Sequence, residues 1–430
     1  MILTEVQQDI EGRICGDVIH PCYASYCLSK LPSAILALLG VPQPEHPLAH
    51  ILRQAAAQQG SPRKVILLVI DGFGWHQWRR HAEHYDFFAR LTERGTLAPI
   101  TTVFPSTTAA ALTTIHSGLT PQEHGLPEWF VYFDELDSIV ATLPFTALGA
   151  KGGDRLLEAG VKPTILFDGT TIYQTLAKAQ VPSFTFARAA YARSAYSCLV
   201  HKGSQTISYI NASDLLVNVR QKLLEVSGPA YFYVYWDAVD AIAHTYGPHT
   251  EQYHAELAGF SYLLRQELIE KVDARVAEEV MLIVTADHGH LNVAPKAALY
   301  LQRYPTLVRS LQHSPAGKAM LPWGSPRDLF LCVQEERLPE VATWLRKRLR
   351  DYATVLMIDD ALQQGLFGLG KLHKRFKSRV GNLLILPHRE HLIWYEHLKG
   401  KRFDLLGMHG GLTVDEMLIP LAMANLATLR

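Results

Sequence analysis

Five short segments of this sequence carry side chains suited to binding metal ions or phosphate. They hold carboxylates, imidazoles and hydroxyls but no thiolate: Asp71, the run Ser106-Thr107-Thr108, Asp240 with His244, Asp287 with His288, and His409. Such oxygen and nitrogen ligands suit a pair of divalent ions, with Zn²⁺ favoured where imidazoles are rich and Mn²⁺ as the alternative. Two ions about 3.5–4 Å apart stabilise both the attacking and the departing oxygen of an in-line phosphoryl displacement.

Each segment taken alone also has an ordinary explanation. An Asp-Gly pair after a strand is more often a turn, one hydroxyl before an apolar helical run is an N-cap, and Asp240 with His244 has the spacing of a surface ion pair. His409 stands among glycines, where a loop residue is the commoner outcome but where the backbone also comes close to a ligand. The chemical interpretation depends on all five segments meeting in one place.

The hydroxyl run exceeds what a helix cap requires. Ser106, Thr107 and Thr108 precede Ala-Ala-Ala-Leu, which reads as the start of a helix. A hydroxyl there meets free backbone N–H groups and the positive end of the helix dipole, which favour an alkoxide and a bound phosphate. The position alone does not select one of the three hydroxyls.

Apolar strands place these segments. The runs 64–70, 231–236 and 280–285 are continuous and rich in β-branched or aromatic residues, as fully buried parallel strands are. Helical stretches at 171–179, 212–226 and 255–277 lie between them. This alternation predicts an α/β fold with a mostly parallel central sheet and helices on both faces. In such sheets, catalytic groups gather at the carboxyl ends of the strands.

A change in the pattern of predicted strands and helices indicates a small inserted α+β subdomain at 314–379. It contains a strand at 327–333, an amphipathic helix at 338–350 and a second strand at 353–358, followed by the basic run 371–379. The apolar strand 382–386 is expected to return the chain to the core. The predicted catalytic core is therefore 1–313 and 380–430, with a mostly helical extension, residues 1–60, packed on it.

Composition excludes several classes of function. Lys and Arg together number 41, equal to Asp and Glu, so the chain lacks the positive electrostatic field expected of a protein that binds nucleic-acid polymers. Five Cys without a paired framework predict reduced thiols, which favours the cytoplasm, and the N-terminus has no signal-peptide pattern. The longest apolar runs are far short of the roughly 20 residues that cross a bilayer.

The order and spacing of the five segments resemble the alkaline phosphatase superfamily, most closely its type I phosphodiesterase/nucleotide pyrophosphatase branch, from about Lys64 to the C-terminus. The resemblance implies an alkaline phosphatase-like fold and two metal sites. The first ion would be held by Asp240, His244 and His409. The second would be held by Asp71, Asp287, His288 and the nucleophile.

The nucleophile follows from a spacing within that branch, where the attacking residue stands ten positions before a glycine that ends the same helix. Counting back from Gly118 gives Thr108, with Thr107 in reserve. Aligning instead on Phe104-Pro105 would select Val103, which has no oxygen. The chain lacks the asparagine that holds a phosphate oxygen in nucleotide pyrophosphatases, and Glu128 and Trp129 stand in that stretch as candidate substrate-binding residues.

The resemblance predicts hydrolysis of a small phosphate ester or nucleotide-like substrate through a phosphothreonine intermediate. Aromatic and apolar residues after the hydroxyl helix favour a diester or pyrophosphate, while a cationic group beside the phosphate would favour a monoester. Two alternatives stay open: a phosphomonoesterase or phosphonate hydrolase of the same superfamily, and an inactive metal-binding regulatory module. The basic run 371–379 is either an anion-attracting entrance or, more commonly, a solvated surface.

Overall fold

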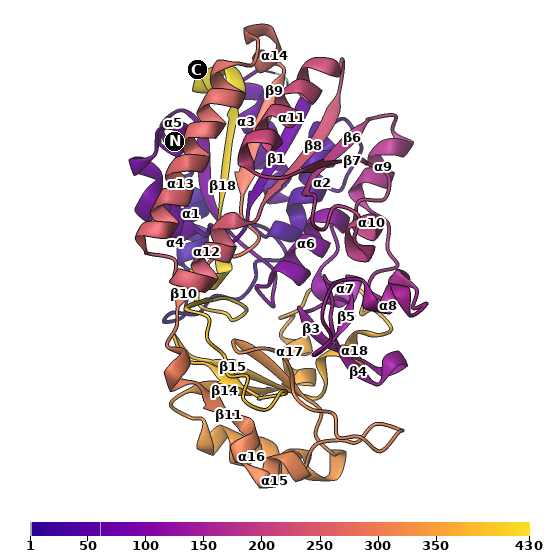
Figure 1. Cartoon of the computed structure of the whole chain (residues 1–430). Helices are drawn as coiled ribbons and strands as arrows, with labels where there is room; N and C mark the ends of the chain where they lie inside the picture. Colours follow the sequence, from indigo (N-terminus) through magenta and orange to yellow (C-terminus); the bar gives the residue numbers. More distant parts are fainter. Residues whose placement is uncertain (1, 61) are drawn as a thin grey trace.

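A seven-stranded sheet lies at the centre of the protein (Figure 1). The computed structural model describes residues 2–60 and 62–430. The strand order is β2-β18-β9-β1-β8-β6-β7. The strands are β1 (Lys64–Ile70), β2 (Thr96–Thr101), β6 (Ser183–Arg188), β7 (Gln205–Tyr209), β8 (Ala230–Trp236), β9 (Val280–Thr285) and β18 (Leu418–Asn425). Neighbouring strands are parallel except at β18, which runs antiparallel to β9 and β2. The predicted α/β class is confirmed.

Alternation along β1 assigns side chains to the two faces of the sheet. Ile66, Leu68 and Ile70 join one hydrophobic cluster, and Val65, Leu67 and Val69 join the other. Since both faces are covered, every residue of β1 is buried. This explains the continuous apolar run in the sequence.

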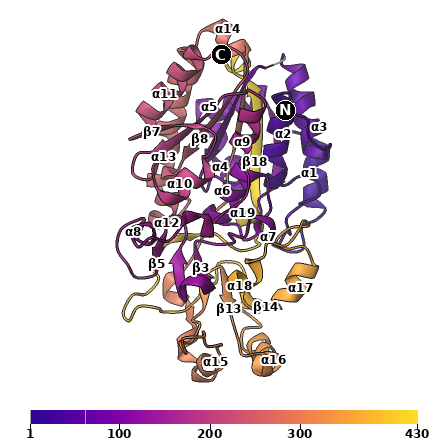
Figure 2. The same ribbon diagram turned by 90° about the vertical axis from the view of Figure 1, so that its right-hand side faces the viewer.

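Helices cover both faces (Figures 1 and 2). The first cluster receives side chains from α1 (Thr4–Glu11), α4 (Trp75–His81), α5 (Asp86–Arg94), α11 (Ala212–Glu225), α12 (Ala238–Tyr246), α13 (Glu251–Leu264) and α14 (Ala274–Glu278). The second cluster receives them from α2 (Leu31–Leu38), α3 (Pro47–Gln58), α6 (Thr108–Ser117) and α9 (Ile172–Lys178). The N-terminal segment therefore contributes helices to both faces.

A four-stranded sheet lies beyond the carboxyl ends of the parallel strands, in the lower part of Figure 1. Its order is β12-β13-β15-β14, with β12 (Trp323–Ser325), β13 (Asp328–Leu331), β14 (Ala353–Met357) and β15 (Leu383–Pro387). Its helices are α16 (Leu338–Arg348), α17 (Ile358–Gln363) and α18 (Phe376–Val380), and α15 (Pro305–Arg309) lies in the same part of the molecule. The limits 314–379 for a separate subdomain stay a prediction.

Smaller elements surround the same edge of the central sheet. A three-stranded sheet consists of β3 (Phe130–Phe133), β4 (Ser138–Ala141) and β5 (Thr146–Ala147). Short helices nearby are α7 (Pro121–His124), α8 (Arg155–Glu158) and α10 (Ala195–Val200), and α19 (Val414–Met417) precedes β18. Two-stranded pairs join β10 (Leu291–Asn292) to β17 (Gly407–Met408) and β11 (Leu299–Tyr300) to β16 (Ile393–Trp394).

Two expected elements differ in detail. The predicted helix 255–277 is divided into α13, a wider π-helical turn at Arg265–Glu270, and α14, and the Asp273 side chain caps α14 by accepting from the Arg275 backbone N–H. Strand β15, expected to rejoin the core, pairs with β13 and β14 in the four-stranded sheet, while its Leu384 packs into the first hydrophobic cluster.

No helix among residues 2–60 and 62–430 is long and apolar enough to span a membrane.

Candidate active site

Three parallel strands end at the same level and carry the carboxylates. In the register of the sheet, Ile70 lies opposite Trp236 and Val69 lies opposite Thr285. Asp71 therefore emerges beside the turn that begins α12 and beside the loop that begins at Ala286. The structure therefore brings these three strand ends together at one edge of the sheet.

The distant His409 reaches this edge through a short strand pair. Leu291, just after the loop 286–290, lies opposite Met408 in the β10–β17 pair. This pairing sets His409 next to His288, with the two imidazole rings stacked at a centroid separation of 3.5 Å. A segment more than a hundred residues away thus completes the site.

One group of ligands surrounds His288. The Nε2 atom of His288 lies 3.3 Å from Asp71 Oδ1, 3.4 Å from Asp287 Oδ2 and 3.1 Å from Thr108 Oγ1. All of these side chains are buried. We call Asp71, Thr108, Asp287 and His288 the buried group.

A second group surrounds Asp240 on α12. The i, i+4 spacing brings His244 Nε2 to within 3.4 Å of Asp240 Oδ2, and His409 Nε2 lies 3.8 Å from Asp240 Oδ1. The side chains of Asp240, His244 and His409 are 14%, 20% and 10% exposed. We call these three residues the outer group. The structure thus brings every residue of the two implied ligand sets into two adjoining groups.

The donor atoms fit divalent cations. Asp71 Oδ1 and Asp287 Oδ2 are buried and accept no hydrogen bond from the described residues. Burial, with the nearby Asp240 and Asp287, raises the pKa of Asp71 well above its usual range, and burial likewise raises the pKa of Asp287. Buried carboxylate oxygens that accept no hydrogen bond and lie close to other carboxylates destabilise the fold unless a cation lies beside them. Two sets of side chains have ligand atoms within 4.8 Å of one another: Asp71, Asp287 and His288; and Asp240, His288, His290 and His409.

The imidazoles are prepared to act as ligands. The Nδ1–H of His244 donates to the carbonyl of Gly407 at 2.8 Å, and that of His409 donates to the carbonyl of Ser106 at 2.9 Å. Each bond leaves Nε2 with its lone pair directed to the site. Burial, together with His288, lowers the pKa of His409 well below its usual range, so its ring is neutral, as metal binding requires.

Thr108, and not Thr107, faces this arrangement. Thr108 is the first residue of α6, lines a cavity and contacts His288. Thr107 is the N-cap residue, and its buried hydroxyl has no hydrogen-bond partner among the described residues. Ser106 donates to the carbonyl of Gly411 at 2.8 Å. The helix ends at Gly118, whose left-handed backbone suits glycine.

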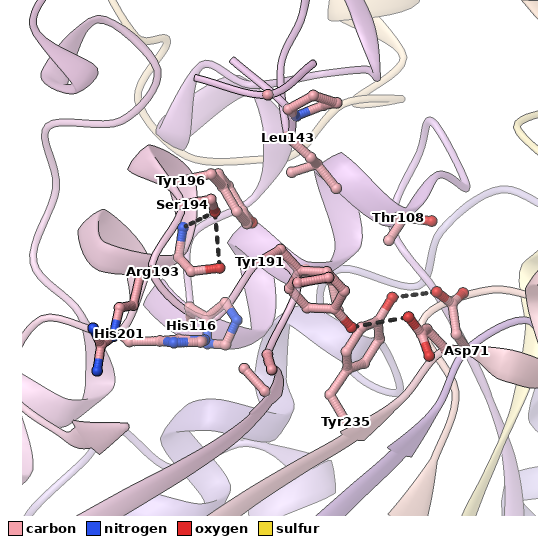
Figure 3. A pocket seen from close by; sticks show the side chains of 18 of the residues that line it. Asp71, Thr108, His116, Leu143, Tyr191, Arg193, Ser194, Tyr196, His201 and Tyr235 are labelled. Carbon is pink, nitrogen blue, oxygen red and sulfur yellow. Dashed lines mark hydrogen bonds between the residues drawn. The ribbon is translucent and has the colours of Figure 1, made fainter. Parts of the chain in front are cut away.

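The cavity next to Thr108 has a volume of about 690 Å³ (Figure 3). Asp71 and Thr108 lie at one end of it, and His116, His201 and Arg193 lie at the other. Tyrosines and apolar side chains form most of the wall between the two ends: Leu112, Leu143, Phe186, Tyr191, Tyr196, Tyr233 and Tyr235. The cavity is large enough for an organic group attached to the phosphate.

The two candidate substrate-binding residues have different surroundings. Trp129 lines the cavity and is 37% exposed. Glu128 is buried beside it, outside the cavity lining, and accepts hydrogen bonds from the backbone N–H groups of Trp129 and Phe130. The geometry therefore places only Trp129 where a substrate would touch it.

The basic run 371–379 does not line the cavity either. Lys374 and Arg375 pair with Asp168, Arg375 also pairs with Glu135, and Lys377 pairs with Asp359. Arg379 is buried and donates to the carbonyls of Gly125 and Ile165. The run is mostly neutralised and structural, which favours the commoner of its two interpretations.

Two residues at the site were missed by sequence reasoning. The hydroxyl of Tyr235 donates to Asp71 Oδ2, and His290 Nε2 lies 2.6 Å from Asp240 Oδ1. In the sequence, Tyr235 is one of several aromatic residues of a strand, and nothing singles it out. For His290, its position two residues after His288, at the same strand end, was a usable signal.

Comparisons with known proteins agree with this geometry. The sequence model of a family described as type I phosphodiesterase / nucleotide pyrophosphatase matches residues 65–412. The structure is similar to that of murine ectonucleotide pyrophosphatase / phosphodiesterase 5, with 19% identity, a TM-score of 0.61, and coverage of 84% of this chain and 87% of that chain. An inactive variant of that murine protein in complex with AMP gives the same values, and the human protein gives a TM-score of 0.59 with the same identity and coverage. A comparison with curated proteins gave no match.

Proposed function

The chain belongs to the type I phosphodiesterase/nucleotide pyrophosphatase family and is a phosphoric ester hydrolase, and on this basis we propose that Thr108 is its nucleophile and that two divalent metal ions occupy its site. The outer group would hold one ion, and the buried group would hold the other. The imidazole content favours Zn²⁺, with Mn²⁺ as the alternative.

The contact of Thr108 Oγ1 with His288 Nε2, at 3.1 Å, carries this proposal. Thr108 also lines the cavity, which supports a role at the reacting phosphate. A hydroxyl in that position also lies at the N-terminus of α6, where the helix dipole favours a negative oxygen.

The reaction would proceed in two displacements at phosphorus. When bound, the ions neutralise the phosphate oxygens and lower the pKa values of the Thr108 hydroxyl and of the hydrolytic water. Thr108 Oγ1 attacks phosphorus, the bond to the departing alcohol or phosphate breaks, and a phosphothreonine forms. Water then attacks the same phosphorus from the vacated side and releases Thr108. Two inversions give net retention.

The cavity favours a diester or pyrophosphate over a monoester. A dianionic monoester needs a cationic side chain at its extra oxygen, whereas a diester needs room for a second organic arm. Of the described residues that line the cavity, Arg193 is the one Lys or Arg, and it lies at the end away from Thr108 (Figure 3). The aromatic walls suit a planar group such as a nucleoside, in line with the AMP bound by the murine relative.

The test compares Thr108→Ala with the wild type on bis(p-nitrophenyl) phosphate and on p-nitrophenyl phosphate. We expect kcat/KM to fall by at least about 10³-fold on both esters, because the attacking oxygen is lost. We also expect the wild type to prefer the diester. Acid quenching during turnover should trap phosphate on the peptide that contains Thr108, detected by mass spectrometry.

Thr107→Ala is the matched control, because it removes a neighbouring buried hydroxyl that has no hydrogen-bond partner among the described residues. It should keep activity within about tenfold of the wild type. Full activity in Thr108→Ala, or phosphate trapped on another residue, would exclude Thr108 as the nucleophile.

A further inference from the structure

Two kinds of contact occur among the polar atoms of the site, and distance separates them. Two atoms bound to one tetrahedral ion at about 2.1 Å lie about 3.4 Å apart. The contacts of His288 with Asp71, Asp287 and Thr108 and that of His244 with Asp240 fall between 3.1 and 3.4 Å. These are the separations expected of co-ligands.

The contacts of Tyr235 and His290 are different. His290 Nε2 lies 2.6 Å from Asp240 Oδ1, and Tyr235 donates to Asp71 Oδ2 at short range. The 2.6 Å separation of His290 from Asp240 is that of a strong hydrogen bond to a carboxylate and is too short for two ligands of one ion, and the Tyr235 hydroxyl is likewise a donor to a carboxylate oxygen. Both residues therefore contact a carboxylate oxygen directly.

Each bond occupies one oxygen and leaves the other free. Asp71 Oδ2 accepts from Tyr235, while Asp71 Oδ1 accepts no hydrogen bond from the described residues and faces His288 Nε2. On the other side, Asp240 Oδ1 accepts from His290 and lies 3.8 Å from His409 Nε2, while Oδ2 faces His244 Nε2 at 3.4 Å. Each carboxylate thus keeps one oxygen that accepts from neither Tyr235 nor His290 and that faces an imidazole.

The surrounding chain holds the ring of His290 in this position. A Cβ atom at Gly72 would come within 2.7 Å of His290 Cδ2, and one at Gly407 would come within 3.1 Å of His290 Nδ1. The side chain of Gln77 donates to the carbonyl of His290 at 2.6 Å. Glycines next to two of the chemical motifs therefore leave room for a buried imidazole.

We propose that Tyr235 and His290 are positioning residues that orient the carboxylates of Asp71 and Asp240, Tyr235 for the ion of the buried group and His290 for the ion of the outer group. This inference rests on the proposed two-metal site but not on the identity of the nucleophile. Removing a hydrogen bond to a metal ligand typically weakens metal affinity 10–100-fold. Each residue should therefore affect one ion of the pair.

The test measures Zn²⁺ affinity of the full-length apo protein, without substrate, by competition with a chromophoric chelator. We expect Tyr235→Phe and His290→Ala each to lower the affinity for one of the two bound ions by about 10–100-fold and to leave the affinity for the other unchanged. The double variant should lower both affinities, because the two changes act on different carboxylates. Unchanged affinities in both single variants would overturn the proposal.

Matched variants separate positioning from general damage. Tyr233→Phe removes a buried hydroxyl from the same face of β8 that has no hydrogen-bond partner among the described residues, so its Zn²⁺ affinities should equal those of the wild type. His290→Gln keeps an N–H donor near the position of Nε2 and should recover most of the affinity lost in His290→Ala. Circular dichroism checks that each variant folds.

Cobalt substitution distinguishes a positioning residue from a direct ligand. If His290 only donates to Asp240, the visible spectrum of the Co²⁺ protein should keep its intensity in His290→Gln, because the coordination number is unchanged. A changed coordination spectrum, or loss of an ion that glutamine does not restore, would show that His290 binds the metal and would refute its positioning role. Because these measurements use no substrate, they stay informative even if Thr108→Ala keeps full activity.

Discussion

Two regions of this protein bury carboxyl groups, and their surroundings differ. At the ends of the central strands, Asp71, Asp240 and Asp287 are interleaved with imidazoles, and two of their oxygens accept no hydrogen bond from the described residues. About the four-stranded sheet, Glu128 and Asp328 are buried beside each other, and burial followed by mutual repulsion raises the pKa of Asp328.

Among the described residues, neither Glu128 nor Asp328 forms an ion pair with a Lys or Arg side chain. The neighbouring Arg327 is fully buried, but its Nε and Nη2 atoms donate to the two carboxylate oxygens of Glu416, at 2.9 Å each. The Glu128–Asp328 pair is in neither set of side chains able to hold an ion among the described residues. Carboxylates interleaved with imidazoles offer ligand atoms to a cation, whereas carboxyls buried beside each other are more easily protonated, because burial and mutual repulsion raise their pKa values.

Asp287→Asn should give the largest effect of any change that tests this contrast. Asn in place of this proposed ligand has no negative charge and has an amide nitrogen in place of one carboxylate oxygen, so we expect kcat/KM on bis(p-nitrophenyl) phosphate to fall by about 10³-fold or more. Asp237→Asn is the control at the same sheet edge, since Asp237 pairs with Arg188 and Tyr191 instead. A comparable fall in kcat/KM in Asp237→Asn would contradict the distinction between the proposed ligands and the other carboxylates at this sheet edge.

Arg327→Met should give the next largest effect, on stability. It leaves Glu416 charged and buried without its partner, which we expect to lower the free energy of unfolding by about 3–5 kcal/mol, measured by urea denaturation. The double variant Arg327→Met/Glu416→Leu should recover most of that loss. A stable single variant would mean that another group neutralises Glu416.

Glu128→Gln should change how stability depends on pH. Burial raises the pKa of Glu128 to about 8, whereas an unfolded glutamate titrates near 4.5. The stability contributed by the protonated group is therefore complete below about pH 4.5 and is lost as pH rises through about 8. We would measure the free energy of unfolding with urea at pH 5, 7 and 9, with chelator present. Between pH 5 and pH 9 this free energy should fall less in the variant than in the wild type, by on the order of 1–3 kcal/mol. Identical profiles would show that the pair holds no proton near neutrality.

Trp129→Ala should give the smallest effect. The indole lines the cavity without touching the ligand groups, so we expect KM for bis(p-nitrophenyl) phosphate to rise about 3–10-fold with kcat nearly unchanged. Glu128→Gln assayed in parallel should leave KM unchanged, because Glu128 does not line the cavity. A larger loss in kcat for Trp129→Ala would place the indole closer to the reacting phosphate.

The two ligand sets are implied by the family resemblance, and the sequence places each of their members after a predicted strand or in a short motif. Continuous apolar runs identify buried strands, and the register of parallel strands then forces Asp71, Asp240 and Asp287 to one edge. The resemblance points to Thr108 through the ten-residue spacing to Gly118, which ends the same helix. The identities of the ligands and of the proposed nucleophile were therefore available from spacing and resemblance.

Contacts between distant segments were not available in the same way. Tyr235 and Asp71 are separated by 164 residues, and His290 and Asp240 by 50. The ion pairs that neutralise the basic run, and the pairing of β15 with β13 and β14, also depend on segments that no periodicity connects. Spacing along the chain sets which groups appear at a strand end, but only the folded packing decides which oxygen of a carboxylate is occupied and which is left for an ion.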